Sequence, residues 1–67
     1  MELGATAVPA VKDGINTTKD SRVRADLLRV LGRIATKDDA SFIEPFTKDK
    51  NDRVARAAAD AMVRLSR

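Results

Sequence analysis

Two segments of this 67-residue chain repeat the same pattern of residues at a constant distance. Residues 20–34 match residues 51–65 after a shift of 31 positions, and apolar residues then fall on apolar residues. Three pairs are identical in this register: Arg22 with Arg53, Val23 with Val54, and Arg33 with Arg64. Self-similarity at a fixed period is typical of proteins built from stacked copies of one supersecondary unit. The repeat therefore limits the possible folds more than any other feature.

Both segments are expected to form helices. Each has apolar residues at positions i, i+4, i+8 and i+11, namely Val23, Leu27, Leu31 and Ile34 in the first copy and Val54, Ala58, Met62 and Leu65 in the second. This spacing predicts a helix with one stripe facing a core. Asp20 and Asn51 precede the stripes, and their side-chain oxygens are expected to cap the first turns.

A shorter apolar segment precedes each of these helices and predicts a partner helix. One contains Val8, Val11 and Ile15, and the other contains Phe42, Ile43 and Phe46. The intervening linkers are short, which favours antiparallel neighbours. Pro9 is expected near the start of the first helix and Gly14, in a left-handed conformation, at its end. Pro45 falls well inside the third helix, so that helix is expected to be kinked or split near residues 41–45.

These expectations define an all-α fold of four helices in two stacked antiparallel hairpins, a fragment of an α-solenoid. The chain is too short for more than one domain, so residues 1–67 form a single unit, with repeat unit 1 at about 5–35 and unit 2 at about 38–66. Two bare repeats predict an exposed apolar end, because repeat arrays usually need about three units and polar caps. The alanines of residues 55–61 would admit a closely packed neighbour, and a second copy of the chain would cover such an end.

The composition excludes several functions. The chain has neither Cys nor His, which removes disulfides, thiolate metal sites and the commonest general base. Its 13 Lys and Arg against 10 Asp and Glu give a charge of +3, which permits nucleic-acid binding without requiring it. Two Phe are the only aromatic residues, so platforms for stacking bases are absent. We therefore predict a protein that is not an enzyme and needs no cofactor.

Five arginines are the candidate binding residues. Arg22, Arg29 and Arg33 lie at i, i+7 and i+11, on one side of the second helix, and Arg53 and Arg64 have the equivalent places on the fourth. The planar guanidinium of Arg matches both phosphates and carboxylates. A solvated face balanced by nearby aspartates is the other interpretation.

Two further clusters have simple structural explanations. Asp38, Asp39 and Glu44 resemble a cation site or an acid–base pair, but aspartates before a helix normally satisfy its first N–H groups. Phe42 and Phe46 are four residues apart and are expected in the core, because the chain has no other aromatic side chains to fill it.

The sequence resembles the short HEAT-like repeat of phycobilisome-lyase-type proteins. The resemblance lies in residues 7–11 (Ala-Val-Pro-Ala-Val), 20–24 (Asp-Ser-Arg-Val-Arg) and 31–34 (Leu-Gly-Arg-Ile), and in the second unit at Ala40, Asp49, residues 53–54 (Arg-Val) and 57–62 (Ala-Ala-Ala-Asp-Ala-Met). It covers nearly all of residues 5–66 and implies two antiparallel helices per repeat. In such families Asp and Arg of neighbouring repeats interlock, which implies an ion pair between Asp49 and Arg24.

The resemblance implies a protein-binding or scaffold module of HEAT type, with another protein, or a second copy through the apolar repeat ends, as its partner. Nucleic-acid binding through the arginines is one alternative, and an accessory subunit of a lyase-type enzyme is another. No apolar run approaches the roughly 20 residues that span a bilayer, so no membrane partner is expected. The first residues carry no signal-peptide pattern, and the expected location is the cytoplasm.

Overall fold

A computed structural model of the chain describes the backbone of residues 3–66 and the side chains of residues 7–66. Within that range it contains helices and turns and no strand. The elements are α1 (Leu3–Thr17), α2 (Ser21–Ile34), the 3-10 helix η1 (Lys37–Asp39), α3 (Ala40–Ile43), the 3-10 helix η2 (Glu44–Lys48) and α4 (Asp52–Leu65).

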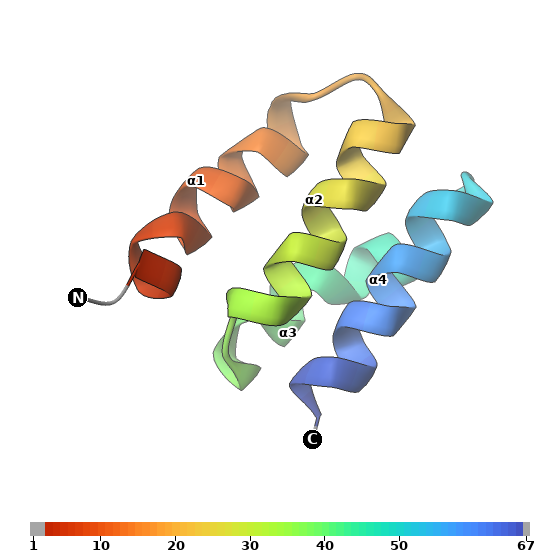
Figure 1. The fold of residues 1–67 in the computed structure, drawn as a ribbon. Helices are drawn as coiled ribbons and strands as arrows, with labels where there is room; N and C mark the ends of the chain where they lie inside the picture. The colour runs from red at the N-terminus through yellow and green to blue at the C-terminus, as the bar shows by residue number, and fades with distance from the viewer. Residues whose placement is uncertain (1–2, 67) are drawn as a thin grey trace.

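The helices form two stacked hairpins, as the repeat predicts. α1 packs against α2, whereas α3 and η2 together pack against α4. Figure 1 shows α2 between α1 and α4, with α3 behind α2 and α4. The two hairpins are joined mainly by the contact of α2 with α4, so the second helices form the continuous layer of the stack.

Both second helices begin at the expected caps. Asp20 Oδ1 accepts hydrogen bonds from the backbone N–H groups of Arg22 at 2.8 Å and Val23 at 3.5 Å. Asn51 Oδ1 accepts the equivalent bonds from Arg53 at 2.9 Å and Val54 at 3.2 Å. The following helices, α2 and α4, are each 14 residues long, so the repeat is preserved in local structure as well as in sequence.

α1 differs from the prediction at Pro9 and Gly14, the two residues expected near its ends. It begins at Leu3, so Pro9 lies inside the helix instead of near its start. Gly14 does not end the helix, which continues to Thr17, and no described glycine has a positive φ. A Cβ on Gly14 would lie 3.1 Å from Leu27 Cδ1 of α2. Gly14 therefore serves the close approach of the two helices, and not a turn.

The third helix is split as Pro45 predicts. α3 ends at Ile43, and the chain continues as the 3-10 helix η2, with Pro45 in its first turn. Proline has no N–H to donate to the carbonyl four residues earlier, and its ring crowds that carbonyl, so the α-helical pattern stops here. The prediction of a break near residues 41–45 is confirmed.

The core lies where the two hairpins meet. Its largest fully buried side chains come from every layer, and they are Ile15, Leu28, Leu31, Ile43 and Val54. Phe42 and Phe46 are half-buried against this core, with ring centroids 5.6 Å apart, as expected for core residues.

The residues expected on the apolar stripe of α2 agree only in part with the residues that are buried. Val23 is 43% exposed, and Leu27 and Ile34 are half-buried. The residues of α2 that are buried are Ala25, Leu28, Leu31 and Gly32. α2 contacts α1 on one side and α4 on another, so its buried surface is rotated away from the stripe that the sequence indicates.

Three of the five alanines between residues 55 and 61 are buried within the chain, whereas Ala59 is exposed. Ala57, Ala58 and Ala61 are buried, and a Cβ added to Gly32 would lie 2.8 Å from Ala61 Cβ. Small side chains on both helices let the backbones approach closely at this point. The large apolar side chains that are exposed among the described residues are Val23 and Val30 of α2 and Val63 of α4.

Candidate interaction surface of the second helices

The exposed side of α2 and α4 forms two open, adjoining grooves lined mainly by charged side chains. The first groove is lined by Asp20, Ser21, Arg22, Arg29, Asn51, Asp52, Arg53 and Arg56. The second is lined by Asp26, Arg29, Val30, Arg33, Arg56, Asp60 and Arg64. Arg29 and Arg56 belong to both, so the two grooves are one continuous surface, which we call the arginine surface.

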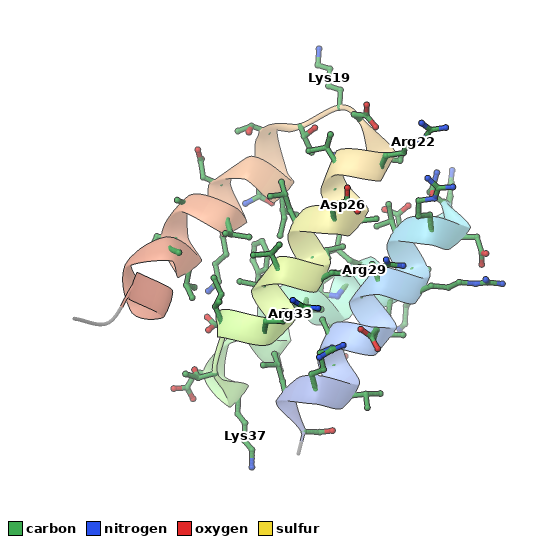
Figure 2. The ribbon with its side chains drawn as sticks, viewed as in Figure 1. Lys19, Arg22, Asp26, Arg29, Arg33 and Lys37 are labelled. Atoms are coloured by element: carbon green, nitrogen blue, oxygen red, sulfur yellow. The ribbon has the colours of Figure 1, made fainter. Side chains whose placement is uncertain are left out.

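All five predicted binding arginines lie on this surface. Figure 2 shows Arg22, Arg29 and Arg33 along α2, on its side toward α4. Spacings of seven and four residues align them, and stacking of the hairpins places Arg53 and Arg64 beside them on α4.

Arg56 also lines both grooves, although the repeat comparison did not select it. The residue 31 positions earlier is Ala25, so Arg56 has no basic counterpart in the first repeat. The sequence could have identified Arg56, because it lies three residues after Arg53, about one helical turn away on the same side.

The arginine surface is positive, because its six arginines face four aspartates. Arg56 Nε lies 2.9 Å from Asp52 Oδ2, and Arg64 Nε lies 3.1 Å from Asp60 Oδ2. Both pairs are well exposed, so each contributes little to stability.

The other four arginines of the surface, Arg22, Arg29, Arg33 and Arg53, form no ion pair with any residue whose side chain is described. Asp20 lines the surface too, but its carboxylate accepts the capping N–H groups of α2. Most guanidinium groups of the surface are therefore unpaired within the described part of the chain.

The acidic cluster near α3 has a structural role. Asp39 does not cap α3. Its carboxylate instead forms an ion pair with Lys12 of α1, and it accepts a hydrogen bond from the Thr36 N–H at 3.1 Å. The hydrogen bond from Lys12, and then the one from Thr36, lower the pKa of Asp39 below its usual 3.8. Lys12 Nζ also lies 5.3 Å from the Phe42 ring centroid, so this side chain links α1 to the second hairpin.

No group of three or more acidic, His or Cys side chains in the described part of the chain is arranged to hold a metal ion. Asp38 and Glu44 are exposed. The cluster of Asp38, Asp39 and Glu44 thus contributes a contact between hairpins through Asp39, and we assign no chemistry to it.

The ion pair expected between Arg24 and Asp49 is not among the ion pairs of the described residues. Arg24 instead donates to the carbonyl oxygens of Ile15, from Nε at 3.2 Å, and of Thr18, from Nη2 at 2.6 Å. Asp49 Oδ1 accepts from the Asn51 N–H at 2.8 Å. Each side chain satisfies backbone groups at its own turn, where the end of a helix leaves carbonyls or N–H groups without partners.

None of the helices in the described part of the chain is long and apolar enough to cross a bilayer. In comparison with known protein families, residues 2–63 match a family described as HEAT repeats. No curated protein and no solved structure matches the chain.

Proposed function

The chain belongs to the HEAT-repeat family, and from this premise we propose that it is a non-catalytic protein-binding module whose arginine surface binds an acidic segment of a partner protein. HEAT-repeat modules are generally scaffolds that mediate protein interactions. The family supports the class of function, and the arginine surface supports the chemistry of the partner.

One observation carries this proposal: six arginines line a continuous open surface, and four of them have no ionic partner among the described side chains. A guanidinium group donates two parallel hydrogen bonds to a carboxylate, so Asp or Glu side chains of a partner suit this surface. An extended acidic segment would follow the boundary between α2 and α4, along which the arginines are distributed.

Nucleic acid is the second candidate, because phosphates also accept hydrogen bonds from arginine. The four aspartates that line the same surface would repel a continuous phosphate backbone, whereas a peptide with spaced carboxylates can avoid them. We therefore favour the acidic peptide.

The test is a fluorescence-anisotropy titration of the chain with a labelled peptide whose Glu residues are separated by neutral residues and, separately, a labelled DNA duplex. The variant R22E/R29E/R33E reverses the charge of the α2 part of the surface. We expect it to bind the peptide about 3- to 100-fold more weakly, because each exposed ionic contact is worth about 0.2 to 1 kcal/mol.

The matched control is K19E/K37E/K48E, which changes the net charge by the same amount at exposed positions outside the arginine surface. It should retain most of the peptide binding. Equal losses in the two variants would mean that only net charge matters and would refute the site. Tighter binding to the duplex, with an affinity that falls steeply as salt rises, would replace the acidic peptide by nucleic acid.

A further inference from the structure

Two valines of α2 are exposed although their counterparts in α4 are fully buried. Val23 is 43% and Val30 is 44% exposed, whereas Val54 and Ala61, which stand 31 residues later, are both 0% exposed. Ala61 is the residue that Gly32 of α2 approaches, and Val54 lies two helical turns before it on the same side of α4. The exposed side of α2 is therefore the side that, in the second repeat, another second helix covers. We call Val23, Asp26 and Val30 the leading face of α2.

The opposite side of α4 shows the complementary situation. Arg56, Ala59 and Val63 are exposed there, and Val63 is 53% exposed. A shift of 31 residues takes these three to residues of α2 that are all buried: Ala25, Leu28 and Gly32. We call Arg56, Ala59 and Val63 the trailing face of α4.

The contact between α2 and α4 within one chain indicates which residues of the two faces would meet between copies. Gly32 of α2 approaches Ala61 of α4. Their counterparts are Val63 on the trailing face and Val30 on the leading face. A second copy stacked in the same way would thus place its Val63 against Val30. Two valines need more room than Gly and Ala, so the helices of the two copies would lie farther apart than α2 and α4 do.

The charges of the two faces also match. Ala25 of α2 and Ala57 of α4 are each 1% exposed. Their counterparts on the free faces are Arg56 and Asp26, which carry opposite charges. Arg56 already forms an exposed ion pair with Asp52. Replacing Asp52 by Asp26 of a second copy would cost little, because exposed ion pairs contribute little to stability.

We propose that the leading face of α2 binds the trailing face of α4 in a second copy of this chain, so that copies stack head to tail as the hairpins stack within one copy. Such a contact joins two different surfaces and does not close on itself, which gives short linear stacks. One helix against one helix buries much less than the roughly 800 Å² per partner of a standard interface, so the association should be weak and should depend on concentration.

The test is sedimentation velocity over a concentration series up to about 1 mM, the range in which weak contacts are populated. The wild-type mass should rise from 7.3 kDa toward twice that value and above. Val30→Glu and Val63→Glu each add a charge to one face at an exposed position, and circular dichroism should show that both remain helical. Each variant alone should stay monomeric.

A mixture of the two variants distinguishes head-to-tail stacking from other arrangements. V63E keeps an intact leading face and V30E keeps an intact trailing face, so an equimolar mixture should form dimers and nothing larger. Ser41→Glu adds the same charge at an exposed position of α3 outside both faces, and it should associate like the wild type.

Two results would overturn the proposal. One is a wild-type chain that stays at 7.3 kDa at every concentration. The other is a single-face variant that dimerises by itself, since this would mean that one face pairs with its own copy. Asp26, Val30 and Arg56 of these faces also line the arginine surface. The sedimentation experiment contains no peptide, and R22E/R29E/R33E changes no residue of either face, so the two proposals fail separately.

Discussion

α2 and α4 have the same length, begin at equivalent caps and align their arginines, yet they bury different side chains. In α4 the buried positions include Val54 and Ala61, whereas the counterparts Val23 and Val30 in α2 are exposed. In α2 the buried positions include Gly32, whereas its counterpart Val63 in α4 is exposed. Whether a hairpin is first or second in the stack therefore decides which side of its second helix is covered. The repeated sequence decides where that helix begins and how long it is.

Exchanging a pair of counterparts between the two helices should have the largest effect. Gly32→Val gives α2 the residue that α4 carries at the equivalent position, but its Cβ would lie 2.8 Å from Ala61 Cβ and 2.9 Å from Ala61 Cα. Because the backbone of α4 cannot give way easily, we expect a loss of about 3 kcal/mol or more of unfolding free energy. Urea denaturation measures this loss.

The reciprocal change, Val63→Gly, is the control for that experiment. Val63 is exposed, so its loss should cost only the lower helix propensity of glycine, about 0.5 kcal/mol. Equal effects of the two substitutions would contradict the assignment of Gly32 to the contact between α2 and α4.

Truncating the equivalent valines should give the next largest difference. Val54→Ala removes two buried methyl groups and should cost about 1 to 3 kcal/mol. Val23→Ala removes the same groups from an exposed site and should change stability by less than about 0.5 kcal/mol. Thermal unfolding at low micromolar concentration, where copies do not associate, makes the comparison. Similar losses at both positions would mean that the two helices are covered on the same side.

Removing the caps tests what the two repeats have in common. Asp20→Ala and Asn51→Ala should each cost about 1 kcal/mol, because each cap accepts two N–H groups at the start of its helix. Helical circular dichroism during urea denaturation reports both losses. A cost for only one substitution would indicate that the two turns are not equivalent in solution.

The smallest expected effect concerns the contact between α1 and the second hairpin. The pKa of Asp39 is lower in the folded chain than its usual 3.8, so the pair with Lys12 stabilises the fold above that pH. This contribution is lost as the pH falls through the lowered pKa of the folded state. The pair is partly exposed, so we expect less than about 1 kcal/mol. Lys12→Gln should reduce the acid dependence of the melting temperature, and an unchanged dependence would show that the pair is ineffective.

Local rules made much of this fold predictable from the sequence. The caps at Asp20 and Asn51 and the break at Pro45 depend on a few neighbouring residues, and the structure bears them out. The five arginines share a surface because spacings of 4, 7 and 11 residues keep side chains on one side of a helix, and the 31-residue repeat places equivalent arginines on both second helices.

Features that depend on neighbouring helices were not predictable in this way. Gly14 has the residue type of a helix end but makes room for Leu27 of α2. The family resemblance implies a carboxylate of the other repeat as the partner of Arg24, although two backbone carbonyls are closer along the chain. Val23 lies on the apolar stripe but is 43% exposed, and periodicity alone does not say which part of a stripe is covered.

The 3-10 helix η2 gives the turns inside the two hairpins unequal resistance to proteases. Hydrogen bonds of 3-10 geometry are weaker than those of an α-helix, and η2 leads directly to the exposed Lys48 and Lys50. The turn after α1 also exposes a lysine, Lys19, but there Arg24 donates to the carbonyl of Thr18. Brief trypsin digestion should therefore cut after Lys48 or Lys50 before it cuts after Lys19, and so detach α4 from its partner helix first.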